Sequence, residues 1–350
     1  MTLPESVRAL RYGCAISHHT WVHPWRVTGE HAWEAMDYLC PLELRLLDSQ
    51  VRQTLLLNED GTPFADCVLA LDDEDFLLLL EGPGDGEVDA WFHRHVPDGL
   101  DVQLIDLAPT HDVWGLDGPY SWQLMAAVVG PEVMGLPYLT LFREDGWLCL
   151  RTGKTGEFGY DLLVEKARVP EVLGQIRASG IPLDLVEVGQ DELDLCALEN
   201  FFFNIRQEGK SGATPLELQL QWRISRKKVF VGSAALQARR LEGCRHRLTT
   251  LLSDTETRQG QLLYRDGVEV GRVVNSRHSP LLGKWILLAQ MDLSVAWPGL
   301  SGFHIGEPLA AGTARTVCPP LLHNRSLAID LRKHRYVSRD RDVFPPVVVT

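Results

Sequence analysis

The residues that most strongly suggest chemistry lie in the middle of the chain, in the segment 151–164. Three glycines recur there at every third position: Gly153, Gly156 and Gly159. Glycine adopts positive φ at little cost, so this loop can bring its backbone close to a ligand. The run from Tyr160 to Val164 predicts a strand. Asp161 stands on it at the loop edge, where an ionised carboxylate suits a heterocycle rich in N–H donors. The alternative is a glycine-rich hairpin with a solvated aspartate.

Two further residues have a possible chemical role but also an ordinary structural interpretation. Asp66 interrupts the apolar run from Phe64 to Leu71, which we expect to be the return strand of a hairpin. A carboxylate in such a run must find partners or carry a shifted pKa, although it could also cap the preceding turn. Trp222 is either a core residue or a flat face that stacks on a bicyclic ring.

Composition limits the classes of partner. With 350 residues the chain is long for one core, so two or three domains are expected. Its formal net charge of −13 argues against a nucleic acid partner. The apolar runs are far shorter than the ~20 residues of a membrane span, and the N-terminus has no secretion-signal pattern. The seven scattered cysteines predict reduced thiols and a cytoplasmic location.

A metal site is not expected. His19 and His23 would share one face of a helix, which is a possible ligand spacing. However, Thr20, Val22 and Pro24 disfavour a helix there, and no cluster of cysteines or carboxylates follows. Oligomeric state stays open.

Strand and helix patterns predict an α+β protein built from antiparallel sheets. Two successive segments each contain several strands and a helix, and the chain is strand-rich from Gly243 onward. The first predicted α+β domain covers residues 1–100, with part of 190–240 packing on it, and the second covers 101–190. Residues 191–240 are predicted as connecting helices, with a long helix over 191–205. Residues 241–331 are predicted as an all-β domain and 332–350 as a tail.

Five segments together carry a family resemblance. They are Leu56–Gly61 with Asp66, Leu116–Pro119, Arg151–Leu162, Thr214–Glu217 with Trp222 and Phe230–Gly232, and Gly267–Val273. In this order and spacing, from about residue 14 to 330, they resemble the aminomethyltransferase (glycine-cleavage T-protein) superfamily of tetrahydrofolate-dependent enzymes. The resemblance implies a three-domain cloverleaf, with two α+β domains and a C-terminal β-barrel or jelly-roll-like domain around a central folate channel.

The resemblance also implies roles for individual residues. Asp66 falls on the catalytic aspartate beside the reactive N5/C1 unit of the folate. Asp161 falls on the carboxylate that pairs with the pterin edge, where glutamate is usual. Trp222 falls on a folate-lining tryptophan, Glu81 on a position often held by asparagine, and Lys154 on one where tyrosine is usual.

Departures from the family pattern point away from the housekeeping T-protein. Ala65 stands where an aspartate is usual, Leu198 and Asn204 replace charged residues, and a family segment before Cys14 is not found. We therefore expect a methyl or methylene transferase that uses tetrahydrofolate, or its 5-methyl or 5,10-methylene form, and a small-molecule donor or acceptor.

Two alternatives remain. One is a non-catalytic folate-binding protein of the same fold, as in relatives linked to iron–sulfur cluster assembly. Those relatives carry a Lys-Gly-Cys motif where this chain has Asn204–Gly209. The other is a degenerate channel that binds a different acid or heterocycle.

Overall fold

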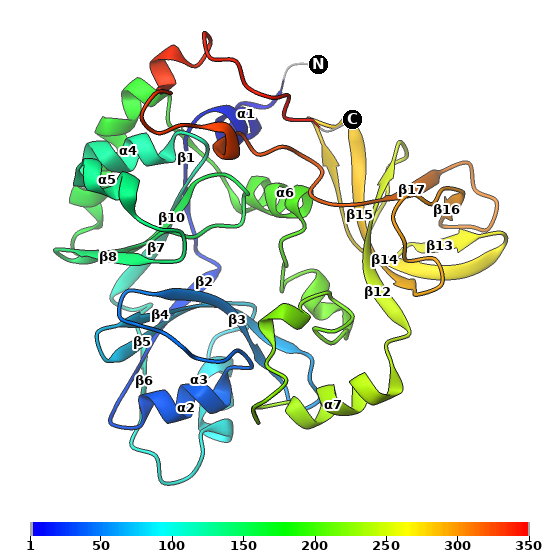
Figure 1. Ribbon diagram of the computed structural model, residues 1–350, viewed down its shortest axis with the longest axis horizontal. Helices are drawn as coiled ribbons and strands as arrows, with labels where there is room; N and C mark the ends of the chain where they lie inside the picture. Colours follow the sequence, from blue (N-terminus) through cyan, green and yellow to red (C-terminus); the bar gives the residue numbers. More distant parts are fainter. Residues whose placement is uncertain (1–2, 349–350) are drawn as a thin grey trace.

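The computed structural model describes residues 3–348 and arranges them as three lobes around a central junction (Figure 1). Two lobes contain open sheets covered by helices, and the third is a closed β-barrel. The predicted α+β class, with two antiparallel-sheet lobes and an all-β C-terminal lobe, is confirmed. No helix within the described range is both long enough and apolar enough to cross a membrane.

The first lobe is a five-stranded antiparallel sheet in the order β3-β4-β5-β2-β6. Its strands are β2 (Val22–Thr28), β3 (Val51–Leu57), β4 (Pro63–Asp72), β5 (Asp75–Glu81) and β6 (Gln103–Asp106). Helices α2 (Ala32–Leu39) and α3 (Glu87–His95) cover one face. Met36 and Leu39 form a helical stripe that packs against Leu69 and Leu78 of the sheet.

The second lobe is a six-stranded sheet in the order β11-β1-β7-β10-β9-β8. Its strands are β1 (Ala15–His18), β7 (His111–Asp117), β8 (Leu141–Glu144), β9 (Trp147–Leu150), β10 (Gly159–Glu165) and β11 (Val186–Glu187). Only the pairing of β1 with β11 is parallel among those described. Helices α1 (Glu5–Tyr12), α4 (Ser121–Val129) and α5 (Val169–Gly180) belong to this lobe, together with the 3₁₀ turns η1 (Pro131–Gly135) and η2 (Ile181–Leu183).

Alternation along β10 decides which way its side chains face. Tyr160, Leu162 and Val164 pack into the core beneath α4 and α5. Side chains of a strand alternate between the two faces of a sheet, so Asp161 and Leu163 face the other way. Leu163 packs there in a cluster that also contains Leu77 and Leu79 of the first lobe. The two sheets thus pack on each other, and Asp161 lies on the face turned toward the first lobe.

The third lobe is a barrel in the order β12-β15-β14-β13-β16-β17. Its strands are β12 (His246–Ser253), β13 (Leu262–Arg265), β14 (Val268–Ser279), β15 (Lys284–Asp292), β16 (Phe303–Ile305) and β17 (Thr313–Val317). Helix α7 (Ser233–Glu242) precedes the barrel in sequence. Side chains on one face of strands β12, β14 and β15 join an apolar cluster with Leu55 and Leu57 of the first sheet and Phe203 of the connecting segment.

The connecting segment between the second and third lobes is only partly helical. Helix α6 (Gln190–Asn200) lies at the centre of the molecule (Figure 1), and η3 (Glu208–Ser211) and η4 (Gln221–Arg223) follow. The predicted helix over 191–205 is wrong beyond Asn200, because Phe201 adopts a left-handed conformation with φ +63° that ends the helix. Asn204 therefore lies outside the helix, while Leu198 is buried on it.

The predicted boundary at residue 100 does not match the sheets. Strand β1 pairs with β7 in the second sheet, whereas β6 pairs with β2 in the first. Each lobe thus receives one strand from the sequence range predicted for the other. The reason is that pairing is decided by distant partners: Ile16 of β1 completes the core beneath α4, a contact that local pattern does not reveal.

The segment 332–350 is not a loose tail over its described part, which ends at residue 348. Tyr336, in η6 (Tyr336–Ser338), is buried in the second lobe with its ring 5.4 Å from that of Tyr120. Val348, at the end of the described range, pairs with Leu322 in an isolated antiparallel bridge. The turn η5 (Arg325–Ala328) precedes this segment.

Candidate functional site

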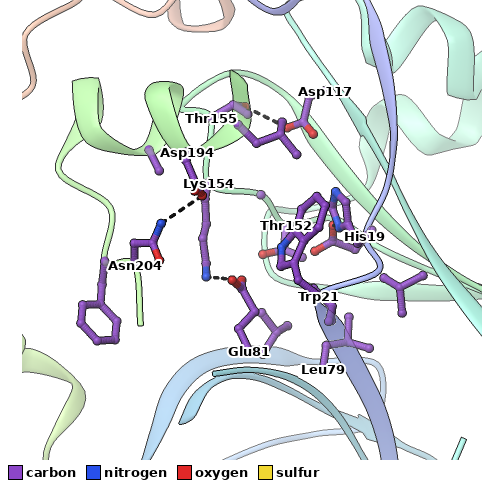
Figure 2. A pocket seen from close by; sticks show the side chains of 18 of the residues that line it. His19, Trp21, Leu79, Glu81, Asp117, Thr152, Lys154, Thr155, Asp194 and Asn204 are labelled. Atoms are coloured by element: carbon purple, nitrogen blue, oxygen red, sulfur yellow. Dashed lines mark hydrogen bonds and ion pairs between the residues drawn. The ribbon is translucent and has the colours of Figure 1, made fainter. Parts of the chain in front are cut away.

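A cavity lies where the two sheets, the loop before β10 and the connecting segment meet. The space between its walls is about 740 Å³, open solvent at its mouth included. The residues that line it are His19, Trp21, Val22, Gln53, Val68, Leu79, Glu81, Val113, Asp117, Thr152, Gly153, Lys154, Thr155, Asp161, Leu193, Asp194, Ala197, Phe203, Asn204 and Arg206. Figure 2 shows these side chains converging from several elements.

The loop that sequence analysis singled out is fixed in place from behind. The carbonyl of Thr155 accepts hydrogen bonds from Arg11 at 2.7 Å and from Asn200 at 2.9 Å. The carboxylate of Glu157 accepts from the backbone of Arg325 and Ser326 in η5. With its outer side held by α6 and the C-terminal segment, the loop presents Lys154 to the cavity (Figure 2).

Lys154 forms one ion-pair cluster with two other predicted site residues, Asp66 and Glu81. Its ammonium lies 2.7 Å from Asp66 and also contacts Glu81. Arg223 binds the other oxygen of Asp66 at 2.7 Å, and Asp66 is only 4% exposed. Burial by itself would raise the pKa of Asp66, but Lys154 and Arg223 outweigh it and lower that pKa. Asp66 is thus an ionised carboxylate with both oxygens engaged.

A second set of ion pairs continues from Glu81 toward the barrel. Arg206 contacts Glu81 and lies 2.6 Å from Asp194 of α6. Arg277 of β14 lies 3.1 Å from the other oxygen of Asp194. The cavity is therefore lined by charged groups of the first two lobes and the connecting segment, and Arg277 of the barrel pairs with one of them, Asp194.

Asp161 and Asp117 differ from Asp66 because no Lys or Arg nitrogen in residues 3–348 lies within ion-pair distance of either carboxyl. Burial raises the pKa of Asp161 to about 8, and repulsion from Asp117 and Glu81 adds to this. Burial likewise raises the pKa of Asp117 to about 7, although the Thr155 hydroxyl donates to it at 2.8 Å. Both carboxyls thus keep their protons to a higher pH than an exposed aspartate does.

Apolar side chains form the walls between these polar groups. Val68 and Leu79 come from the first sheet, Val113 from the second, and Trp21 from the link between β1 and β2. The guanidinium of Arg206 lies 5.7 Å from the Trp21 ring. Such a cavity suits a flat, partly apolar molecule with hydrogen-bond donors along one edge.

Trp222 is not brought into this cavity. It lies in η4, is 61% exposed, and lines a neighbouring hollow of about 510 Å³. Gln53 and Phe203 line both spaces, so the hollow adjoins the main cavity. The Arg223 guanidinium lies 4.9 Å from the Trp222 ring. A ligand would have to extend past Gln53 to reach this tryptophan.

Sequence reasoning missed three residues that line the cavity: His19, Asp117 and Arg206. His19 was considered only as a metal ligand, and among the described residues no group of three or more His, Cys, Asp or Glu side chains could hold a metal ion. Burial lowers the pKa of His19 to about 4, so its imidazole is neutral. Asp117 lies within the Leu116–Pro119 motif, at the end of β7, and its carboxylate was a signal that could have been used.

The fold and the cavity together define a class, a three-lobed protein with a central small-molecule site, and comparison with known proteins identifies the family. The model of the GCVT N-terminal domain family matches residues 2–228, so the chain belongs to this family. The resemblance inferred from the sequence motifs is confirmed.

Curated relatives and solved structures agree with this assignment. The chain is 26% identical to an aminomethyltransferase of Thermotoga petrophila over 89% of this chain and 90% of that protein. It is 28% identical to an aminomethyltransferase of Clostridium botulinum, with 76% and 75% covered. The structure of the glycine cleavage system aminomethyltransferase T from Bartonella henselae superposes with a TM-score of 0.80, at 20% identity, over 92% of this chain and 90% of that one. This last likeness shows the shared fold alone.

Proposed function

We propose that this protein is a tetrahydrofolate-dependent one-carbon transferase that moves a methyl or methylene unit to or from a small molecule. The observation that carries the proposal is the pair of carboxyls, Asp161 and Asp117, which line the cavity with no Lys or Arg nitrogen of residues 3–348 within ion-pair distance. Buried polar groups need partners, so these carboxyls favour a ligand that brings hydrogen-bond donors.

The residues present fit a reduced pterin. Its ring edge carries adjacent N–H donors, which Asp161 could accept, while Val68, Leu79 and Val113 would pack against the ring faces. The adjoining hollow with Trp222 would hold the part of the ligand that extends from the ring. When bound, tetrahydrofolate would supply a nitrogen that carries the one-carbon unit.

Positioning and electrostatics would be this chain's main contributions to catalysis. Lys154 and Arg206 hold Glu81 beside the cavity, and Lys154 and Arg223 hold Asp66 ionised. A fixed carboxylate such as Glu81 at the cavity wall would stabilise developing positive charge without reorganising. Asp66 does not line the cavity and would act from farther back, through Lys154. We propose this polarising role for Asp66, since a carboxylate with a lowered pKa is a poor proton acceptor.

The relatives named aminomethyltransferase match most of this chain's length, which supports transfer of an aminomethyl-type carbon unit. We propose further that the donor or acceptor is a free small molecule rather than a carrier-bound group as in the housekeeping reaction. The support is the departure at Lys154, which engages two carboxylates at the cavity where the family usually has tyrosine.

A second candidate is a folate-binding protein without transferase activity. The engaged state of Asp66 favours it, because both oxygens are held by cations and neither is free for a substrate. The two candidates share the folate site and differ only in turnover.

The test is isothermal titration of the full chain with tetrahydrofolate, beside the Asp161→Asn variant. We expect micromolar binding by the wild type and at least tenfold weaker binding by Asp161→Asn, which keeps the shape but loses the carboxylate. Asp254→Asn, at an exposed barrel position, is the control and should bind like the wild type. Absence of wild-type binding would exclude both candidates, and binding followed by a screen of methyl and aminomethyl donors would separate them.

A further inference from the structure

Three residues stand in one row across the second sheet. Ser17 of β1 pairs with Gly115 of β7, and Gly115 pairs in turn with Asp161 of β10. Residues paired across neighbouring strands point to the same face, so Ser17 and Asp161 flank the glycine on the face turned toward the first lobe. Strands are roughly 4.8 Å apart, which leaves a gap of about 9.6 Å between β1 and β10 with no side chain at Gly115.

The imidazole of His19 fills this gap. Its Nε2 lies 2.8 Å from the Ser17 hydroxyl, and its Nδ1 lies 3.5 Å from Oδ1 of Asp161. A Cβ at Gly115 would lie 2.8 Å from the Ser17 oxygen and closer still to His19 Nε2. Gly115 therefore makes the space in which the imidazole bridges the serine and the aspartate.

This Ser–His–Asp arrangement is not that of a hydrolase. Ser17 is 1% exposed and is not among the cavity-lining residues, so its hydroxyl cannot reach a substrate. The end of the bridge that meets the cavity is Asp161, and His19 also lines the cavity (Figure 2). Ser17 can therefore influence the cavity only through the His19 imidazole and Asp161.

We propose that His19, oriented by Ser17, is a positioning residue that keeps Asp161 hydrogen-bonded, and so held in place at the cavity, in both its protonated and its ionised state. The inference rests on the proposed function only in taking Asp161 as the group that binds the ligand's N–H edge. Because the bridging histidine can present either a lone pair or an N–H to Asp161, it supports both protonation states of the carboxyl.

The two states differ by one proton. In the first, Asp161 is protonated and its O–H donates to Nδ1, while Nε2–H donates to Ser17. In the second, the carboxyl is ionised and accepts from Nδ1–H, while the Ser17 hydroxyl donates to Nε2. Passing from the first to the second releases one proton to solvent, and the imidazole stays neutral but changes tautomer. Burial, which holds the pKa of His19 low, keeps the ring neutral in both.

Other charged groups around the bridge bias this equilibrium. Asp117 of β7 and Glu81 of β5 favour protonated Asp161, and Lys154 of the loop favours the ionised form. Glu81 favours a charged His19, whereas Lys154, His18 and Arg206 oppose it. A variant that removes only the imidazole leaves these groups in place.

The first test needs no ligand. Nitrogen NMR of the ¹⁵N-histidine-labelled full chain, from pH 5 to 9, should show His19 passing from the Nε2–H to the Nδ1–H tautomer as Asp161 ionises. The His19 signals are assigned by their loss in His19→Gln, and the transition should vanish in Asp161→Asn. A single tautomer across the whole range would overturn the proposal.

The second test measures tetrahydrofolate affinity against pH. The bond from Nδ1–H to the ionised carboxylate is charge-assisted and therefore stronger than the bond from the neutral carboxyl to Nδ1. Because His19→Gln removes both bonds, the midpoint should move up by about one pH unit. His19→Asn places an amide near the position of Nδ1 and should keep most of the wild-type profile. Gly115→Ala, which displaces the ring, should behave like His19→Gln.

His18→Gln is the matched control, because the neighbouring His18 stacks on Trp114 and is not among the cavity-lining residues. Its profile should equal that of the wild type. If His19→Gln instead weakens binding equally at every pH with an unchanged midpoint, the histidine is merely structural and the proposal is wrong. If the wild type binds no folate, the proposed function fails, and the ligand-free NMR experiment still decides the bridge.

Discussion

At the scale of single residues, Asp66 and Asp161 differ most in the charged groups that surround them. Asp66 lies between two cations and is held ionised, whereas Asp161 faces a neutral imidazole and another carboxyl. Desolvation favours the neutral form of a carboxyl and a nearby cation favours the charged form, so these residues take opposite roles. One provides a fixed charge and the other an exchangeable proton.

The raised pKa of Asp161 predicts that folate affinity increases with pH. If the ligand binds only the ionised carboxylate, then below a pH of about 8 Asp161 must release a proton when the ligand binds. Affinity should then rise about tenfold per pH unit up to that value and level off above it. Titrations between pH 6 and 9 measure this, and Asp161→Asn should show a flat profile. A wild-type profile equally flat would mean that the ligand takes no charge-dependent contact with Asp161.

Because Lys154 and Arg223 hold Asp66 ionised, we expect a different result for Asp66→Asn. Folate binding should stay nearly intact and turnover should fall, because the fixed charge is lost while the cavity shape remains. Arg223, 3% exposed, would lose its charged partner, so unfolding free energy should drop by about 3–5 kcal/mol. Thermal denaturation, titration and turnover assays measure the three effects separately. Collapse of folate binding in a folded variant would show that Asp66 is a structural residue instead.

At the scale of elements, the loop before β10 shows how a local pattern and a tertiary contact combine. The glycine spacing predicted a loop with permissive backbone, and Gly156 does adopt φ +82°. Its lack of a side chain serves a second purpose that the sequence could not reveal. A Cβ there would lie 2.5 Å from Nδ2 of Asn324 and 2.7 Å from Oδ1 of Asn200. At Gly156 the missing side chain thus makes room for Asn200 and Asn324 and not for a ligand.

Gly156→Ala should therefore destabilise the protein more than backbone strain alone explains. Gly260 is the matched position, since its φ is +88° and a Cβ there would meet no atom within 4 Å. Gly260→Ala should cost about 1 kcal/mol, and Gly156→Ala about 1–3 kcal/mol more, because Asn200 and Asn324 must move. Chemical denaturation of both variants measures the difference. Equal costs would mean that the loop yields without disturbing α6.

At the scale of the whole molecule, the lobes are joined by chain segments that cross between them. The link from His19 to Trp21 leaves the second sheet and enters the first, and it lines the cavity on the way. The ion pairs of Arg206 and Arg277 join the connecting segment to the first sheet and to the barrel. The cavity therefore depends on the placement of all three lobes.

The C-terminal segment is part of this architecture, which yields a prediction. Tyr336 is buried against the second lobe and its hydroxyl donates to Asp184 at 2.8 Å, so Tyr336→Ala should lower unfolding free energy by about 3 kcal/mol. Val337, 88% exposed, is the adjacent control, and Val337→Ala should change stability by less than about 0.5 kcal/mol. Equal melting temperatures for the two variants would restore the interpretation of residues 332–348 as a loose tail.

The sequence by itself determined the secondary-structure content, the α+β class, the family and the segment that carries Lys154 and Asp161. These follow from hydrophobic period, turn residues and motif order, which are local properties of the chain. Strands β4 and β10, for example, contain the predicted runs Phe64–Leu71 and Tyr160–Val164 and extend each of them by one residue at either end.

Only the tertiary structure decided which strands exchange between lobes, which charges neutralise one another, and that His19 lies over Gly115. Each of these depends on groups far apart in the sequence: Lys154 meets Asp66 across 88 positions, and Asp161 meets His19 through a strand row that joins β1, β7 and β10. A local pattern specifies where a side chain can point, but its partner, and hence its protonation state and role, is set by the element that packs against it.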